Sequence, residues 1–318
     1  MTEIPGTIVV ALGGNALAPP GERATIHDQF RHTRESLSAV VALAREGWHI
    51  AIVHGNGPQV GDELERNELA HERVAPLPLG VLVAATAGWI GYMIQQSLQN
   101  ALLAAGVKRD VLTIITQSSL DRTAPGASEP TKPIGHALSP DTVERMRGRG
   151  VPVGQDGAGY WRRLAPSPEP EDVVEADAVR QLVREGKIVI AAGGGGAPVY
   201  FDERLYWEGV DAVVDKDRVA AILGDRLGAD ALLILTDVDA VYQGWGTPHA
   251  EPLKHLTVAQ AEALLESGEL GKGSMRPKVE AAVAFLRGGG KRAIVAHLAD
   301  GLAAIRGEAG TTITGDVE

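Results

Sequence analysis

The fold of this chain is decided by the stretch Thr7-Ile8-Val9-Val10-Ala11-Leu12-Gly13-Gly14-Asn15-Ala16-Leu17. Its apolar start, rich in β-branched residues, predicts a buried strand that ends on two glycines and an asparagine. Glycines let a backbone approach a ligand closely, so the turn predicts a phosphate site if a helix begins near Ala16. The same letters also fit an ordinary turn.

The order of strand, glycine turn and helix recurs along the chain. A second apolar strand, 48–53, leads into His54-Gly55-Asn56-Gly57-Pro58-Gln59-Val60-Gly61, and a third, 188–192, leads into Gly193-Gly194-Gly195-Gly196. The second turn misses the dinucleotide-binding glycine spacing by one residue, and the third lacks the Gly-Lys-Thr or Gly-Lys-Ser of a P-loop. We therefore expect anion-binding turns of another kind. At a strand end, His54 fits a hydrogen-bonded structural residue better than a base.

Composition narrows the class of protein. Of 318 residues, 44% are apolar and only 4% aromatic, so the core must consist of aliphatic side chains, as in parallel sheets covered by helices. The net charge of -11 argues against a nucleic-acid or anionic-membrane surface. The absence of cysteine excludes disulfides, thiolate metal sites and a cysteine nucleophile.

Residues 79–94 are nearly all apolar, with Thr86 the main exception, but they are too few to span a bilayer and predict a buried helix. No secretion signal is recognisable, so we expect a cytoplasmic protein.

Three lysines stand in unusual settings. The stretch from 118 to 170 is rich in proline, glycine and charge and predicts a lid or small subdomain; within it, Lys132 precedes a proline and must lie on extended backbone. Lys216 stands between Asp215 and Asp217 at a predicted helix start. Lys278 falls near the amino end of another predicted helix, which is unfavourable unless an anion is present. Lys132 alone also fits a solvated surface charge, and the Asp-Lys-Asp run also fits an exposed charge cluster.

With these motifs in place, the chain resembles the carbamate kinases of the amino acid kinase family along essentially its whole length. The matching segments are Val9 to Ala16, His54 to Gly61, Pro130-Thr131-Lys132-Pro133-Ile134-Gly135, the four glycines from Gly193, Val214-Asp215-Lys216-Asp217 and Gly273-Ser274-Met275. The resemblance implies an α/β fold: a three-layer α/β/α sandwich with a mostly parallel open sheet. It further implies a substrate lobe (about 1–195), a nucleotide lobe (about 196–318), a protruding flap at 121–168, and a homodimer.

The resemblance also implies a reaction and a set of site residues. The reaction moves a phosphoryl group between carbamoyl phosphate and ADP, giving ATP and carbamate, with Mg²⁺. The phosphoryl and carbamate groups would be held by Gly13, Gly14, Asn15, Gly55, Asn56 and Gly57. Catalysis would rest on Lys132, Lys216, Lys278 and Asp215. The nucleotide would be bound by Lys216, Asp217, Thr236, Asp237, Val238, Tyr242, Met275 and Lys278, and no residue is implied as a metal ligand.

Two departures from the family pattern concern the acceptor side. The flap reads Ala158-Gly159-Tyr160-Trp161-Arg162 where the family usually has Gly-Arg-Gly-Trp-Arg, and Ala87 stands where relatives carry a glutamine before Gly88. These changes leave open a phosphotransferase of the same family that acts on another small carboxylate or phosphonate. A nucleotide-binding sensor without turnover is a further alternative, although binding alone would not require all three lysines.

Overall fold

The computed structural model describes residues 6–14, 17, 25–124, 127–157, 159–270 and 275–316. The elements of its first part are β1 (Thr7–Leu12), α1 (Ile26–Ser36), α2 (Ser38–Arg45), β2 (His49–His54), α3 (Gly57–Ala70), α4 (Leu79–Ala104), β3 (Val111–Thr113), β4 (Gln117–Leu120), β5 (Pro130–Ile134), α5 (Pro140–Gly148), β6 (Val153–Gln155), β7 (Trp161–Pro166), β8 (Pro170–Val173), α6 (Ala176–Arg184) and β9 (Ile188–Ile190). Those of the second part are the 3-10 turn η2 (Gly193–Gly195), β10 (Ala197–Asp202), β11 (Tyr206–Gly209), α7 (Lys216–Leu227), β12 (Ala231–Thr236), β13 (Val241–Gln243), β14 (Glu251–Leu253), β15 (His255–Thr257), α8 (Val258–Ser267), α9 (Met275–Arg287), β16 (Arg292–His297), η3 (Leu298–Asp300), α10 (Gly301–Ile305) and β17 (Thr311–Thr314).

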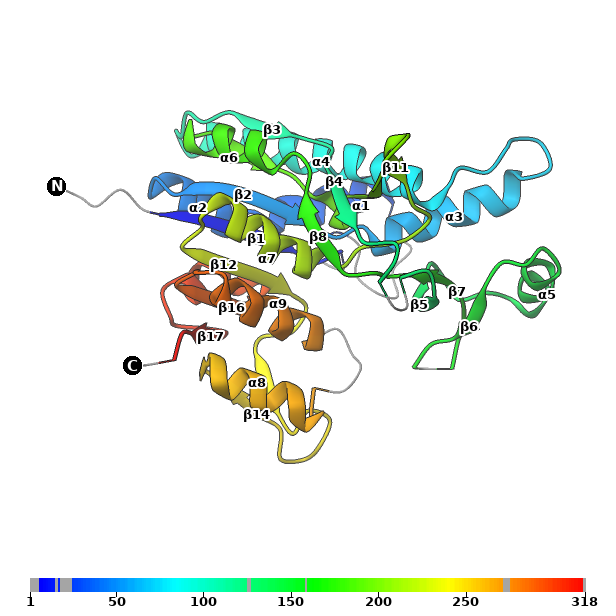
Figure 1. The fold of residues 1–318 in the computed structure, drawn as a ribbon. Coiled ribbons are helices and arrows are strands. Elements are labelled where there is room, and N and C mark those ends of the chain that lie inside the picture. Colours follow the sequence, from blue (N-terminus) through cyan, green and yellow to red (C-terminus); the bar gives the residue numbers. More distant parts are fainter. Residues whose placement is uncertain are drawn as a thin grey trace.

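A single eight-stranded sheet runs through the molecule in the order β15-β17-β16-β12-β1-β2-β9-β3. Neighbouring strands are parallel except β16 and β17, and β1 lies at the centre, with Val9 opposite Leu232 on one side and Ala51 on the other. The mostly parallel α/β fold expected from the sequence is confirmed (Figure 1). Because β1 joins both halves of the sheet, its carboxyl end lies at the middle of one edge.

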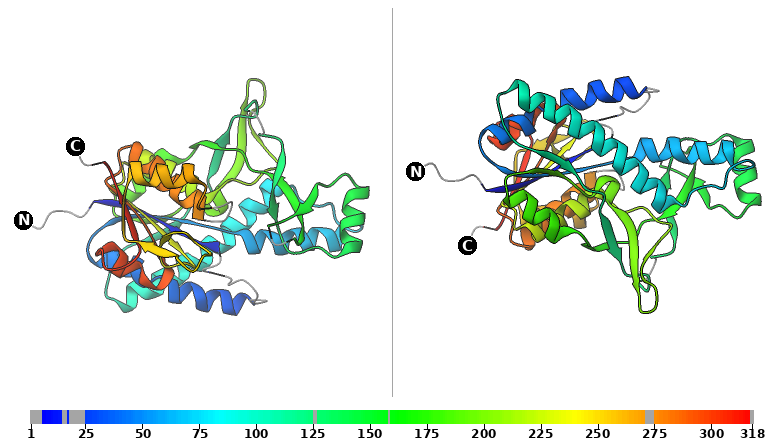
Figure 2. Two further views of the ribbon diagram at one scale, coloured as in Figure 1. Left: turned by 90° about the horizontal axis from the view of Figure 1, so that it is seen from below. Right: turned by 90° about the horizontal axis from the view of Figure 1, so that it is seen from above.

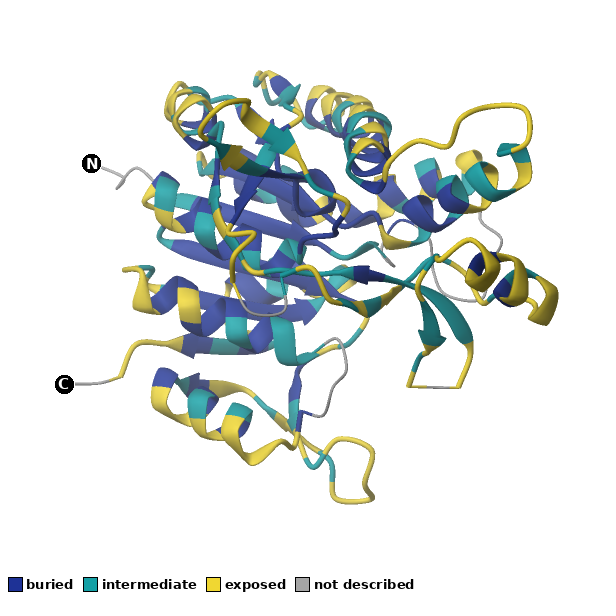
Figure 3. Ribbon diagram, turned by 45° about the vertical axis from the view of Figure 1, so that its right-hand side comes forward, coloured by how far each residue is buried: buried dark blue, intermediate teal, exposed yellow. Residues whose placement is uncertain are grey.

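Helices cover the sheet on both faces, which makes three layers (Figure 2). Successive side chains of a strand point to opposite faces, so Val9 and Ala11 pack in the core beneath α6, α7, α8 and α9. Ile8, Val10 and Leu12 pack instead in the core beneath α1, α2, α4 and α10. A strand that is apolar on both faces is therefore buried on both faces, and the sheet is the most deeply buried layer (Figure 3).

The flap projects from the body beside α3 and consists of the three-stranded sheet β5-β7-β6 and helix α5 (Figure 1). Ile134 and Ala165 at its base pack against Val60 and Leu64 of α3. A Cβ atom added to Gly61 would lie only 3.0 Å from Gly135 Cα, so flap and helix approach closely. A second small sheet, β11-β10-β4-β8, leads the chain out of the body into the flap and back.

Several sequence expectations need correction. The apolar spacing of residues 25–46 predicts a single covering helix, but the structure has two helices that meet at Leu37. Near this junction the hydroxyls of Thr33 and Ser36 donate to carbonyls four residues earlier, an arrangement that bends helices. The sequence also predicts that the apolar strand at 293–296 is the last strand of the sheet, but β17 and β15 extend it. The helix expected from Ala16 onward lies outside the described residues, except for Leu17, and the first described α-helix begins at Ile26.

The apolar run 79–94 forms the first part of α4, a helix of 26 residues whose inner face is buried. Within the described ranges, no helix is both long and apolar enough to cross a membrane.

Candidate active site

The candidate site lies at the carboxyl edge of the central strands. Gly13 follows β1, Gly55 follows β2, the four-glycine turn follows β9 within three residues, and β12 ends at Thr236. In parallel sheets these ends meet at one edge, and ligands bind where the chain turns to opposite sides of a central strand. The glycine turns recognised in the sequence are thus brought to one edge by the sheet order.

The first two turns interlock. A Cβ on Gly55 would lie 2.8 Å from Gly14 N and 3.2 Å from Lys216 Cδ, so no larger residue fits there. The amides of Gly13 and Gly55 donate within the sheet, to Leu235 O at 3.0 Å and to Leu12 O at 2.9 Å. These two amides are therefore engaged in the sheet, and what Gly13 can offer a ligand is close backbone approach rather than its N–H. Asn15 lies outside the described residues.

The second turn opens helix α3 without a side-chain cap. Asn56 occupies the position before the first helical residue, Gly57, but its side chain makes no capping hydrogen bond. Its Nδ2 donates instead to Thr86 Oγ1 at 2.8 Å. The positive end of a 14-residue helix is thus left without a side-chain cap at the edge of the sheet, which suits an anion.

The four-glycine turn has a structural reason. Gly194 and Gly195 have φ values of 68° and 91°, which favour glycine. A Cβ on Gly194 would lie 2.2 Å from Asn56 Nδ2, and one on Gly195 would lie 2.4 Å from Val214 O. The turn therefore fits between the second glycine turn and the segment that enters α7, and it fixes the distance between them.

His54 lies beneath these turns and is fully buried. Its Nδ1 is 3.0 Å from Gly55 O and donates to that carbonyl. Burial lowers its pKa from 6.5 to about 4, and the charge of Lys216 acts in the same direction. The ring is therefore neutral near pH 7 and braces the Gly55 turn, as the structural interpretation predicts.

The three lysines meet around the start of α7. Lys132 Nζ, from the flap, lies 3.5 Å from Asp215 Oδ2. Lys216 Nζ contacts Asp217 Oδ1, and Lys278 Nζ, from α9, lies 3.3 Å from Asp217 Oδ2. Lysines from three separate segments thus share two carboxylates, which leaves one positive charge in excess within this cluster.

The two carboxylates have different surroundings. Asp217 is 3% exposed; burial alone would raise its pKa, but Lys216 and Lys278 outweigh this and hold the pKa below 3.8. Asp215 caps α7 by accepting from Asp217 N at 2.9 Å and from Arg218 N at 3.4 Å. Asp217 therefore stays ionised between two lysines, while Asp215 fixes Lys216 as the first residue of the helix.

The residues expected around the nucleotide follow β12 or begin α9. Thr236 Oγ1 donates to Asp237 Oδ1 at 3.0 Å, and Val238 lies in the turn that follows. Tyr242, on β13, donates to Asp239, which raises its pKa. Met275 begins α9 and packs against the core cluster that contains Val214.

Sequence reasoning missed two features of this region. Trp245 lies 5.0 Å from Tyr242 between ring centroids and is 60% exposed, and nothing in its local sequence distinguished it. Thr86 accepts a hydrogen bond from Asn56. The one feature that marks Thr86 in the sequence is that it is the main polar residue of the apolar run 79–94. In the flap, Trp161 of β7 stacks under Arg147 of α5, whose guanidinium carbon lies 4.4 Å from the ring centroid, so this aromatic side chain joins the helix and the sheet of the flap.

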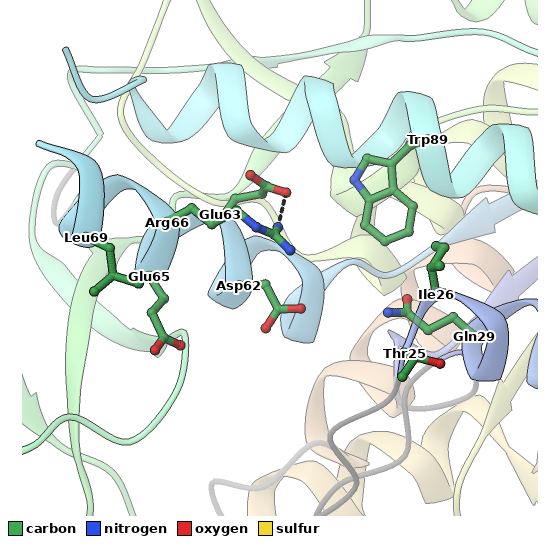
Figure 4. A pocket seen from close by; sticks show the side chains of 9 residues that line it. All are labelled: Thr25, Ile26, Gln29, Asp62, Glu63, Glu65, Arg66, Leu69 and Trp89. Atoms are coloured by element: carbon green, nitrogen blue, oxygen red, sulfur yellow. Dashed lines mark hydrogen bonds and ion pairs between the residues drawn. The ribbon is translucent and has the colours of Figure 1, made fainter. Parts of the chain in front are cut away.

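A hollow of about 700 Å³ lies apart from this cluster, between α3, the start of α1 and the middle of α4 (Figure 4). Its lining consists of Thr25, Ile26, Gln29, Asp62, Glu63, Glu65, Arg66, Leu69 and Trp89. Three carboxylates against one guanidinium make it a poor site for phosphate, and the lining contains none of the three lysines. The glycine turns and lysines therefore define the candidate site.

Comparisons with known proteins show which family the chain belongs to. A family model described as "Amino acid kinase family" matches residues 6–297. The carbamate kinase of Pyrococcus horikoshii is 40% identical over 315 residues, which cover 98% of this chain and 100% of the relative. The carbamate kinase of Clostridium perfringens is 43% identical over 312 residues, which cover 96% of this chain and 99% of the relative. A solved structure, carbamate kinase from Giardia lamblia bound to AMP-PNP, superposes with a TM-score of 0.91 at 32% identity and covers 98% of this chain and 99% of its own.

Proposed function

This chain belongs to the amino acid kinase family, and from that premise we propose that it is a carbamate kinase. It transfers a phosphoryl group between carbamoyl phosphate and ADP, forming ATP and carbamate. The observation that carries the proposal is the convergence of Lys132, Lys216 and Lys278 beside interlocked glycine turns, in a chain about 40% identical to carbamate kinases along its length.

The chemistry needs no general base. The bond between phosphorus and the carbamoyl oxygen breaks, and a bond forms between phosphorus and a terminal β-phosphate oxygen of ADP. The leaving carbamate departs as an anion and the attacking oxygen already carries negative charge, so no proton has to move. Catalysis then consists of positioning and of charge neutralisation, which lysines and glycine turns supply.

The roles of the site residues follow from their places. We propose that the Gly14, Gly55 and Gly57 turns and Asn56 hold carbamate and the transferring phosphoryl group, together with Gly13 and Asn15. Lys132 reaches that group from the flap. Lys216 and Lys278 neutralise the nucleotide phosphates, and Asp215 and Asp217 hold the three lysines in place, as their contacts allow.

The nucleotide is proposed to lie over the end of β12, with its base and ribose among Thr236, Asp237, Val238, Tyr242 and Met275. On this assignment residues 1–195 form the substrate lobe, with the flap at 121–168, and residues 196–318 form the nucleotide lobe. The continuous sheet supports a shared site between them, because β1 pairs with β2 of one lobe and β12 of the other.

Mg²⁺ is proposed to enter with the nucleotide. The described residues contain no group of three or more His, Asp or Glu arranged to hold a metal ion, and both carboxylates of the cluster contact lysines. Magnesium commonly binds through substrate phosphates and water with few protein ligands, so these residues fit a metal that is held mainly by ADP or ATP. When bound, it would supply further neutralisation of phosphate charge.

A homodimer is proposed on the outer face of α4. This helix exposes large apolar side chains along its length: Val81 is 47%, Tyr92 55% and Leu103 79% exposed. Apolar side chains in such numbers on one helix favour burial against a partner. Sedimentation should give twice the chain mass, and Tyr92→Glu should shift it to one chain mass. We also propose a cytoplasmic location, where ADP and ATP would be available as substrates.

The test is formation of ATP from carbamoyl phosphate, ADP and Mg²⁺. Lys132→Ala should lower turnover at least about 100-fold, as loss of one transition-state charge contact does, and leave ADP affinity nearly intact. Lys187→Ala is the matched control, because Lys187 is bonded to Asp110 and precedes β9 at the opposite edge of the sheet. Absence of turnover in the unaltered chain while ADP still binds would refute carbamoyl phosphate as the phosphoryl donor.

A further inference from the structure

Thr86 is buried inside α4 and forms a hydrogen bond with Asn56 of the proposed site. Its Oγ1 lies 2.8 Å from Leu82 O and 2.9 Å from Val83 O, and it donates its one proton to these carbonyls. The same oxygen accepts from Asn56 Nδ2 at 2.8 Å. A hydroxyl that has already given its proton can only accept from a further partner.

These contacts decide which way the Asn56 amide faces. With the nitrogen toward Thr86, all three contacts of the hydroxyl are kept. With the amide reversed, its oxygen would face the hydroxyl oxygen, and Thr86 would have to abandon both helix carbonyls to bond it. The amide is therefore held with its nitrogen toward α4 and its carbonyl oxygen turned away from that helix.

Two further observations show that the position is enforced. Asparagine is among the best residues for capping a helix, yet Asn56 stands at the cap position of α3 and does not cap it. Gly194 packs closely against the same amide, since a Cβ there would lie 2.2 Å from Asn56 Nδ2. Thr86 thus holds Asn56 away from its ordinary local partner, in a slot where a bulkier neighbour would not fit.

We infer that Thr86 is a positioning residue that sets which small substrate the site prefers, carbamate and carbamoyl phosphate over similar carboxylates and their phosphates. It turns the Asn56 carbonyl oxygen into a fixed hydrogen-bond acceptor for the amino group of carbamate and carbamoyl phosphate. An analogue with a methyl or hydroxyl group in place of the amino group lacks that pair of N–H donors. The Asn56 carbonyl oxygen would then be left without a donor, which lowers the affinity for the analogue. The inference rests on the proposed function and adds to it the means of telling carbamate from similar carboxylates.

The experiment compares carbamoyl phosphate with acetyl phosphate, in which methyl replaces amino, as phosphoryl donors to ADP. The unaltered chain should prefer carbamoyl phosphate in kcat/KM. Thr86→Val keeps the shape and removes the hydroxyl, so the preference should fall about 10-fold, the effect of one hydrogen bond. Thr86→Ser restores the hydroxyl and should restore the preference. The KM for ADP should stay the same in both variants, which a general loss of structure would not allow.

The outcomes separate this inference from the proposed function. No turnover with carbamoyl phosphate in the unaltered chain would overturn both. Turnover without a preference over acetyl phosphate, or an unchanged preference in Thr86→Val, would overturn the role of Thr86 alone. If Thr86→Val does not fold, Thr86→Ala serves as the second variant, because it also removes the hydroxyl that accepts from Asn56 Nδ2. Its preference for carbamoyl phosphate should fall by a similar factor, and a preference that persists would refute the inference.

Discussion

Asp217 is the residue whose replacement should most disturb the candidate site. Asp217→Asn keeps the shape of the side chain and removes the negative charge that Lys216 and Lys278 both contact. The three side chains are 4%, 13% and 8% exposed, so water can replace little of the lost interaction. Removing one partner from a buried ion pair costs about 3 kcal/mol or more. We expect a loss of that size in the free energy of unfolding at pH 7.

The loss should depend on pH. Ion pairs hold the pKa of Asp217 below 3.8 in the folded protein, whereas the unfolded carboxyl titrates at about 3.9. The unfolded chain therefore binds the proton first, and the stabilisation is complete above that range and is lost as pH falls through the folded pKa. The difference between the unaltered chain and Asp217→Asn should accordingly narrow below about pH 4.

Urea unfolding at pH 7, 5 and 3.5 measures both effects. Asp215→Asn is the matched control, because asparagine also caps helices and Asp215 is more exposed; it should lose less than about 1 kcal/mol. A loss below about 1 kcal/mol for Asp217→Asn at pH 7, or a loss equal to that of the control, would refute the assignment of Asp217 as the shared partner of two lysines.

Two further predictions concern the turns at the sheet edge. Gly195→Ala should lower the free energy of unfolding by about 3 kcal/mol or more, since φ is 91° and the new Cβ would meet Val214 O at 2.4 Å; Gly209→Ala, with nothing within 4 Å, should leave it nearly unchanged in the same urea titration. His54 has a pKa of about 4 when folded and 6.5 when unfolded, so its contribution of about 3 kcal/mol is present above pH 6.5 and is lost toward pH 4. His54→Asn should therefore flatten that part of the stability profile, and an unchanged slope would count against a buried neutral ring.

The local sequence predicted the repeated units well, because each is set by neighbouring residues. Apolar runs that end in glycine identified β1, β2 and β9. The strands β15 and β17 were missed because a strand of three or four residues carries little pattern, and its pairing depends on distant partners. The junction between α1 and α2 at Leu37 was also missed. The hydroxyl groups of Thr33 and Ser36 that contact the backbone near it do not change the helical spacing of the apolar residues.

The sequence by itself determined the α/β class, the glycine turns and the three lysines worth testing, since residue type and short-range spacing encode these. Only the tertiary structure decided which of them meet. It placed Lys278 of α9 and Lys216 of α7 on the same carboxylate, and it joined Asn56 to Thr86 across two helices. Such contacts follow from the order of strands in the sheet, which is a property of the whole chain. No local run of residues contains it, because pairing partners are chosen by long-range burial and hydrogen bonding rather than by sequence neighbours.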